Sequence, residues 1–234
     1  MSLDFARSKI INSVPNEKLQ DLLQSVHQSS DPQHIKNVKL MAYNRYADSN
    51  IPLEYWKLKM DKDFLGDPRL KQKYQEYIAD IKKSYLNGKS ICFAGGYGLG
   101  KTMTAISILK KAVEKGYSAL YTDLSTIVSI LTQASPEEKL IARRELSMVD
   151  FLMIDELDNR YFQATNASNE TFARSLEFVL RSRTSNTLPV LMATNSPQIK
   201  DTFTNQFKDS LGSIMSKIEM FSVMPGQDYR KETK

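Results

Sequence analysis

The stretch Gly95-Gly-Tyr-Gly-Leu-Gly-Lys-Thr102 decides the fold of this chain. It fits the phosphate-binding loop pattern G-x-x-x-x-G-K-[ST] at every position. Glycines let the backbone curl so that successive N–H groups point inward at phosphate oxygens. The Lys101 ammonium then reaches the β- and γ-phosphates, and the Thr102 hydroxyl can hold Mg²⁺. The residues expected to contact a nucleotide here are Gly95, Gly96, Tyr97, Gly98, Leu99, Gly100, Lys101, Thr102 and Met103.

The segments on either side of the loop agree with this interpretation. Ser90–Ala94 has the apolar character of a short buried strand. Met103–Lys115 predicts a helix that ends at Gly116, because its apolar residues share one face. Strand, loop and helix in this order are the context of a phosphate site; a glycine-rich turn with a chance Lys-Thr pair is the alternative.

From Ser90 onward, strand-like and helix-like segments alternate. This alternation predicts an α/β fold in which a mainly parallel sheet is covered by helices on both faces. The strand candidates are Ser90–Ala94, Ser118–Thr122, Phe151–Asp155, Pro189–Thr194 and Ile218–Val223, which makes a five-stranded sheet.

The composition is that of an ordinary globular protein. The 234 residues are 41% hydrophobic and 25% charged, which suits one good core with a small appendage. The formal net charge of +5 is compatible with nucleic-acid binding without demanding it. Cys92 is the single cysteine, which excludes an intrachain disulfide and predicts a small core residue. No apolar run reaches membrane-spanning length and no signal peptide is recognisable, so we expect a cytoplasmic protein without membrane contact.

Residues 1–48 form a helical region that looks separate from the rest. Short helices are expected over Leu3–Val14, Asn16–His27 and Pro32–Ala47. Pro32 suits the first turn of the last helix, with Asp31 as its cap. Such a small region either packs on the main domain or docks a partner.

The remaining chain divides at about residue 90. Residues 49–89 carry a linker and a helix that runs from Asp67-Pro68 through Leu86. Residues 90–234 are expected to form the nucleotide-binding core.

Two acids follow the apolar run Phe151-Leu-Met-Ile154. A buried parallel strand that delivers acids at its C-terminal end places them beside the phosphate loop. Asp155 would hold Mg²⁺ through its water shell, and Glu156 would orient or deprotonate the attacking water. The alternative is a strand capped by two solvated acids.

A second apolar strand ends in Thr194 and Asn195. A polar side chain at this position can contact the γ-phosphate or the attacking water from the neighbouring strand. Asn195 is the first candidate and Thr194 the second, while a simple strand-ending turn before Ser196-Pro197 is the alternative.

This ordered set of motifs resembles the AAA+ ATPases. The resemblance implies ATP and Mg²⁺ as cofactors and hydrolysis of ATP. Lys101, Glu156 and Asn195 match the catalytic positions, and Thr102 and Asp155 match the metal-binding ones.

Within that family the chain is most similar to bacterial helicase loaders of the DnaC/DnaI type and to the related IstB transposition ATPases. The segments that carry this likeness are Asn50-Ile-Pro-Leu-Glu-Tyr-Trp56, Leu191–Ser196 and Gln227-Asp-Tyr-Arg-Lys231. In such proteins the first segment is a linker that often lies against the adenine, which implies a contact from Ile51.

Ser213–Ile218 resembles the arginine-bearing motif of this group, but Lys217 stands where the family usually has Arg. That Arg reaches the γ-phosphate of the neighbouring subunit. Lysine keeps the charge but loses the planar fork, so hydrolysis between subunits would be slow unless a residue such as Arg183 contributes.

Loaders of this type grip single-stranded DNA, and the stretch Leu124–Asp150 lies where the family places its DNA-contacting helices. The candidates there are Lys139, Arg143 and Arg144, with a solvated amphipathic helix as the alternative. The stretch has no aromatic residue before Phe151, so sequence-independent contacts to phosphates are expected.

The resemblance therefore implies a DnaC-type loader that binds a DnaB-type hexameric replicative helicase, self-associates into a spiral or ring, and uses ATP as a switch. An IstB-like transposition ATPase on duplex DNA and a nucleotide-gated adaptor with little hydrolysis are the alternatives. A small-molecule kinase is a weaker alternative, because Asp155-Glu156 suits water activation better.

Overall fold

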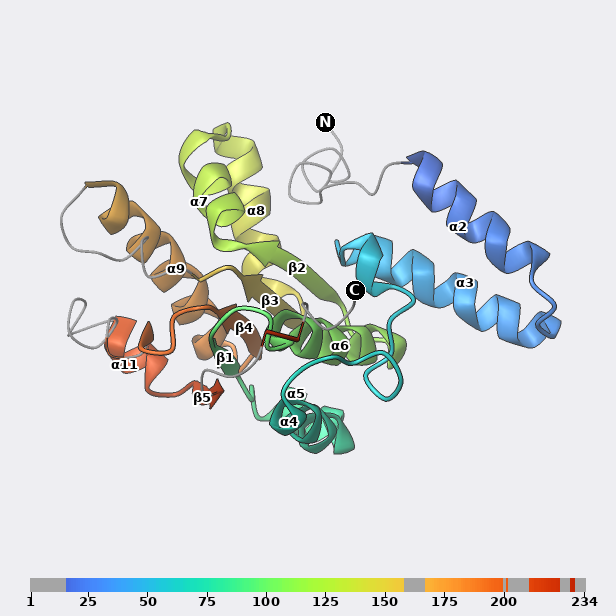
Figure 1. The fold of residues 1–234 in the computed structure, drawn as a ribbon. Helices are drawn as coiled ribbons and strands as arrows, with labels where there is room; N and C mark the ends of the chain where they lie inside the picture. Colours follow the sequence, from blue (N-terminus) through green and yellow to red (C-terminus); the bar gives the residue numbers. More distant parts are fainter. Residues whose placement is uncertain (1–15, 158–166, 200, 202–210, 224–227, 230–234) are drawn as a thin grey trace.

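The computed structural model describes residues 16–157, 167–199, 201, 211–223 and 228–229 (Figure 1). At its centre lies a sheet of five parallel strands in the order β2-β3-β4-β1-β5. The strands are β1 (Ile91–Gly95), β2 (Ala119–Asp123), β3 (Phe151–Asp155), β4 (Val190–Thr194) and β5 (Glu219–Val223). This confirms the predicted α/β fold, and every strand lies within one residue of its predicted position.

Helices cover both faces of the sheet. One face packs against α4 (Pro68–Ala79), α5 (Ile81–Leu86) and α6 (Lys101–Glu114), with α2 (Asn16–Gln28) and α3 (Gln33–Asp48) outside α6. The other face packs against α7 (Leu124–Gln133), α8 (Pro136–Met148), α9 (Ala167–Ser185) and α11 (Leu211–Met215). None of the described helices combines the length and the apolar character that crossing a bilayer requires.

The double coverage explains the sequence of the central strands. β1, β3 and β4 are buried along their whole length, as parallel strands with both faces covered must be. Successive side chains alternate between the layers, so Phe93 faces α6 while Cys92 faces the opposite layer. Burial raises the pKa of the Cys92 thiol to about 12, so it remains a neutral core residue, as expected.

The described part of the N-terminal helical region packs on the core as a hairpin, seen in blue in Figure 1. Arg45 of α3 donates a hydrogen bond to the Val113 carbonyl at the end of α6 (2.9 Å). The Trp56 ring lies 5.5 Å from Tyr43 and 6.0 Å from Tyr46 between ring centroids. The predicted helix over Leu3–Val14 lies outside the described residues.

Two helix boundaries differ from the sequence prediction. The helix predicted from Pro68 through Leu86 breaks at Asp80, whose carboxylate accepts a hydrogen bond from the Lys83 amide (2.9 Å) and so starts α5. Asp31 does not cap α3; Pro32 holds the cap position, while Asp31 pairs with Lys39. Asp67 caps α4 as predicted, accepting from the Arg69 amide at 2.9 Å.

Candidate functional site

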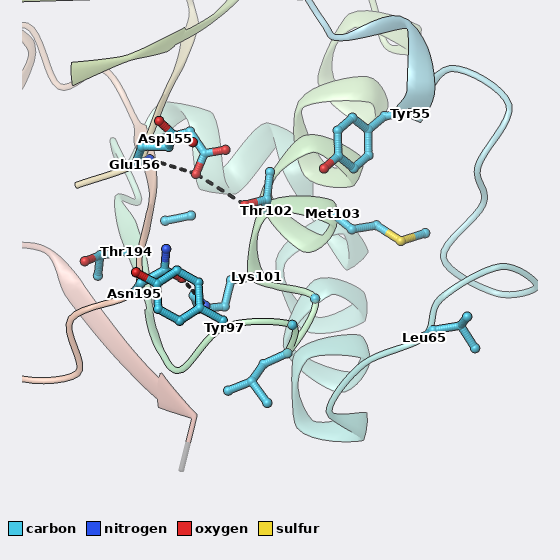
Figure 2. A pocket seen from close by; sticks show the side chains of 14 residues that line it. Tyr55, Leu65, Tyr97, Lys101, Thr102, Met103, Asp155, Glu156, Thr194 and Asn195 are labelled. Atoms are coloured by element: carbon cyan, nitrogen blue, oxygen red, sulfur yellow. Dashed lines mark hydrogen bonds between the residues drawn. The ribbon is translucent and has the colours of Figure 1, made fainter. Parts of the chain in front are cut away.

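The C-terminal ends of β1, β3 and β4 meet at one edge of the sheet, which is where α/β folds bind ligands. A cavity of about 390 Å³ opens there (Figure 2). It is lined by Tyr55, Leu65, Tyr97, Gly98, Leu99, Gly100, Lys101, Thr102, Met103, Asp155, Glu156, Ala193, Thr194 and Asn195. The structure therefore brings together most of the residues that the sequence singled out.

The phosphate loop joins the end of β1 to the first turn of α6, and its glycines are required by space as well as by conformation. Gly100 has φ +90°, and a Cβ there would lie 2.6 Å from the Phe64 ring. Gly95 has φ +154°, and a Cβ there would lie 2.6 Å from the Val223 carbonyl oxygen. A side chain at either position would displace the loop. Gly95 and Gly96 do not line the cavity, so their part is to set the backbone conformation of the loop and not to contact a ligand directly.

Lys101 is the first residue of α6 and is 5% exposed. Its ammonium donates hydrogen bonds to the Gly96 carbonyl and to Asn195 Oδ1, the latter at 3.0 Å. The lysine thus lies between the loop and the end of β4. A phosphate held by Lys101 would lie beside the Asn195 amide.

Oxygen atoms suited to bind a small divalent cation gather in another part of the cavity, around Asp155. Thr102 Oγ1 donates to Asp155 Oδ1 at 3.3 Å, and Tyr121 donates its hydroxyl proton to Asp155 Oδ2 at 3.1 Å. Burial raises the pKa of Asp155, and hydrogen bonds from Glu156, Tyr121 and Thr102 oppose that effect. A hydroxyl beside a carboxylate fits Mg²⁺, which is usually held by one or two such groups together with substrate phosphates. When bound, the ion neutralises charge on the phosphates.

Glu156 lies on the rim of the cavity and is exposed. It has φ +54°, a left-handed conformation that costs a residue with a Cβ roughly 1–2 kcal/mol. The next residue maintains this turn, because the Leu157 amide donates to the Ala193 carbonyl at 3.2 Å and the Leu157 carbonyl accepts from Thr194 Oγ1. The backbone is thereby turned back toward β4, and the Glu156 carboxylate remains at the open side.

The same contacts separate Thr194 from Asn195. Thr194 is 1% exposed, and its hydroxyl is occupied by the Leu157 carbonyl and by the Ser196 amide, which donates to it at 3.0 Å. Asn195 has its amide in the cavity against Lys101. Asn195 is therefore the residue placed to contact a ligand, and Thr194 is structural.

The linker reaches the cavity through a different residue from the one expected. Ile51 is fully buried in the core and does not line the cavity. Its carbonyl accepts a hydrogen bond from Trp56 Nε1 at 2.8 Å. Tyr55 and Leu65 line the cavity instead, and both lie across it from Asn195 (Figure 2).

A comparison with protein families identifies this arrangement. The profile of the ATPase family associated with various cellular activities (AAA) matches residues 91–212, which is just over half of the chain. The chain belongs to this family. AAA ATPases in general bind ATP with Mg²⁺ and hydrolyse it, which agrees with the phosphate loop and the acids gathered here.

Individual relatives are distant. The Lon protease of Parabacteroides distasonis (strain ATCC 8503 / DSM 20701 / CIP 104284 / JCM 5825 / NCTC 11152) is 30% identical over 86 residues, which is 36% of this chain and 10% of the protease. The chain thus matches only a tenth of that curated relative. Its matched part is far too small to carry over what the protease does.

Several solved structures of similar fold are proteins of DNA replication. The DnaC helicase loader has a TM-score of 0.58 at 16% identity, over 74% of this chain and 99% of the loader. DnaI has a TM-score of 0.56 at 18% identity, over 74% of this chain and 94% of DnaI. The initiator DnaA bound to AMPPCP and single-stranded DNA has a TM-score of 0.58 at 16% identity, over 77% of this chain and 53% of DnaA. At these identities the likeness establishes the fold alone.

Two residues considered for action between AAA subunits have very different positions. Lys217 is exposed in the turn before β5, at the edge of the sheet opposite the phosphate loop. It cannot reach the cavity of its own chain, and it is open to a neighbour. Arg183 is 0% exposed, and its guanidinium donates to main-chain carbonyls inside the AAA core. Arg183 therefore cannot act on another subunit, which corrects that expectation.

The three basic DNA candidates all lie on α8, away from the cavity. Lys139 donates to the Thr132 carbonyl at 2.9 Å, whereas Arg143 and Arg144 are exposed. The Arg143 guanidinium lies 5.2 Å from the ring centroid of Phe178, an exposed aromatic residue on α9. Phe178 lies outside the stretch Leu124–Asp150, so the sequence of that stretch does not reveal an aromatic ring beside Arg143.

Tyr121 was also missed, although its position on β2 beside β3 follows from the parallel register. We expect Tyr121→Phe to weaken Mg²⁺-dependent ATP binding by about tenfold, because a partner that orients a metal-binding carboxylate typically contributes that much. Tyr117→Phe, just before β2, is the matched control. The measurement is a titration of ATP at several Mg²⁺ concentrations. Equal Mg²⁺ dependence in Tyr121→Phe and wild type would contradict the assignment.

Proposed function

We propose that this AAA ATPase is an ATP-dependent loader that binds a hexameric replicative helicase and places it on single-stranded DNA. The observation that carries the proposal is that Lys101, Asp155, Glu156 and Asn195 meet in one cavity. A nucleotide in this cavity can act as a switch, because its γ-phosphate would contact residues from three separate segments of the core. Loss of that phosphate would release those contacts.

Each residue has a defined part in the proposed cycle. The loop amides and Lys101 hold the phosphates, while Thr102 and Asp155 are placed to hold Mg²⁺. Asn195 orients the γ-phosphate from the adjacent strand, and the exposed Glu156 carboxylate positions or deprotonates the attacking water. Lys217 of a neighbouring subunit supplies a positive charge to the same phosphate. A lysine in this role supports slow turnover, which suffices for a switch.

Single-stranded DNA is the proposed nucleic-acid partner. The exposed Arg143 and Arg144 are suited to phosphates, and the ring of Phe178 beside Arg143 offers a surface for base stacking. The similarity in fold to DnaA bound to single-stranded DNA supports this part of the proposal. Self-association into a spiral or ring would align these side chains along one strand.

The N-terminal hairpin is the proposed contact for the helicase. Ile35, Val38 and Met41 form a stripe at helical spacing on α3 and are 37%, 65% and 58% exposed. An exposed apolar stripe of this kind is typical of a protein-binding surface. The fold likeness to the DnaC helicase loader, which covers 74% of this chain, supports a helicase as the partner.

The test is the ATPase rate without nucleic acid, with single-stranded DNA and with duplex DNA, each with and without a hexameric replicative helicase. Stimulation by single strands and co-elution with the helicase are the expected results. Stimulation by duplex only, without helicase binding, would instead indicate an IstB-like transposition ATPase. Absence of turnover under every condition would indicate a nucleotide-gated adaptor.

A further inference from the structure

Lys110 lies in the middle of α6 and is 8% exposed, although it is a lysine without a direct ion pair among the described residues. Its ammonium donates to the main-chain carbonyls of Tyr55 (2.7 Å), Trp56 (3.1 Å) and Leu58 (2.7 Å). An ammonium has three donor hydrogens, and here each has a carbonyl partner. The lysine therefore fastens the linker segment 53–58 to α6.

The Trp56 ring of the same segment also packs against Tyr43 and Tyr46 of α3. The Lys110 ammonium also lies 5.2 Å from the ring centroid of Tyr46 on α3, and the Trp56 indole donates to the Ile51 carbonyl. The charged groups around Lys110 are Glu114 on α6 and Lys59 and Asp63 after the segment. Burial nevertheless lowers the pKa of Lys110 to about 8. A buried cation of this kind is costly to maintain, which argues for a role beyond packing.

The geometry links Lys110 to the nucleotide cavity. The segment it holds carries Tyr55, which lines the cavity on the same side as Thr102 and Met103 (Figure 2). The helix that presents Lys110 also begins at Lys101 in the phosphate loop. At about 1.5 Å per residue, the two lysines are roughly 14 Å apart along one rigid helix. Helix α6 thus fixes the distance between Lys101, which is placed to contact the phosphates, and the linker segment that carries Tyr55.

We propose that Lys110 is a positioning residue for nucleoside recognition, which holds the linker so that the Tyr55 ring packs against the base or ribose of a nucleotide bound at the phosphate loop. This inference rests on the proposed nucleotide site. Its new element is the role of Lys110, whose contacts to the carbonyls of segment 53–58 set the position of Tyr55 relative to the phosphate loop.

Comparing two probes tests this division. ADP contains phosphates and a nucleoside, whereas inorganic tripolyphosphate contains phosphates alone. We expect Lys110→Met, which keeps the length and removes the donors, to weaken ADP binding about tenfold, the amount that one aromatic contact contributes. Tripolyphosphate binding should be unchanged. Calorimetric titration of both probes with Mg²⁺ at pH 7 measures this.

Lys111→Met is the matched control, because Lys111 is the next residue on the helix and pairs on the surface with Glu114 at 3.5 Å. It should bind both probes as wild type does. ADP binding at wild-type affinity by Lys110→Met overturns the proposal, and so does an equal loss for both probes, because the effect would then be global. Failure of the wild type to bind either probe would instead overturn the nucleotide site itself.

The pH dependence provides a second readout that does not require Lys110→Met to fold. Above pH 8 the lysine loses a proton and with it one of its donors, so wild-type ADP affinity should fall several-fold between pH 7 and pH 9. Lys110→Arg keeps its charge over this range and should bind ADP with a flat profile. Trp56, the single tryptophan, reports movement of the segment by its fluorescence. Parallel profiles in wild type and Lys110→Arg would overturn the proposal.

Discussion

Glu156→Gln is expected to reduce ATP turnover by about 100- to 1,000-fold while ATP binding stays within about twofold of wild type. The carboxylate lies on the rim of the cavity beside Asp155 and is exposed, so it can accept a proton from a water molecule. Glutamine keeps the shape and the hydrogen-bonding length but is not a base. The phosphate loop and the Thr102–Asp155 pair remain intact, which is why binding persists.

Phosphate release in a single turnover separates the chemical step from product release, and calorimetry with ATP measures binding. Glu137→Gln, an exposed acid in the first turn of α8, is the control and should behave as wild type. Glutamate and glutamine both have a Cβ, so the left-handed backbone at position 156 has the same energetic cost in wild type and variant. Thermal stability should therefore not change. Turnover near the wild-type rate in Glu156→Gln would show that another group activates the water.

Much of the nucleotide site was predictable because it depends on residues that are close together in the sequence. The glycines of the loop are imposed by backbone conformation at Gly95 and Gly100, so their spacing identifies the turn without any knowledge of the fold. The approach of Asp155 to the loop follows from parallel strands ending at one edge. Such features require only short-range geometry and the expectation of a parallel sheet.

Features that depend on distant main-chain contacts were not predictable in this way. The sequence ranks Asn195 above Thr194, but the contact that decides between them comes from Leu157 after β3, whose carbonyl accepts a hydrogen bond from the Thr194 hydroxyl. The linker presents Tyr55 to the cavity while Ile51 is buried, and the Tyr55 carbonyl is held by Lys110, which lies far along the chain. The sequence around Thr194 does not indicate Leu157 as its partner, and the sequence around Tyr55 does not indicate Lys110.

Arg183 is an instructive intermediate case, because a signal existed and was overlooked. Its position on α9 follows Leu176, Val179 and Leu180 at helical spacing, so it lies on the apolar face of the helix. A charged residue on such a face is expected to be buried with partners. The structure shows those partners to be main-chain carbonyls.

Arg183→Met is expected to destabilise the protein by about 3 kcal/mol. The guanidinium donates to the carbonyls of Leu146 (3.0 Å), Val149 (2.8 Å), Asp150 (3.1 Å) and Pro189 (2.9 Å). It thereby joins the connection before β3 to the connection before β4. Each buried carbonyl left without a partner costs about 1 kcal/mol or more, and the relief from no longer burying a charge offsets only part of this.

Burial lowers the pKa of Arg183 to about 9. Because this value is still above neutral pH, the guanidinium remains charged in the native protein. Chemical denaturation and thermal melting measure the loss, and a domain of this size should melt about 10 °C lower. The control is Arg181→Met on the same helix, where an exposed guanidinium pairs with Glu177 at 2.8 Å. That substitution should change stability by less than about 0.5 kcal/mol, since exposed pairs contribute little. Equal effects at the two positions would mean that the four carbonyl contacts do not support the core, and would reopen Arg183 to a role at the surface.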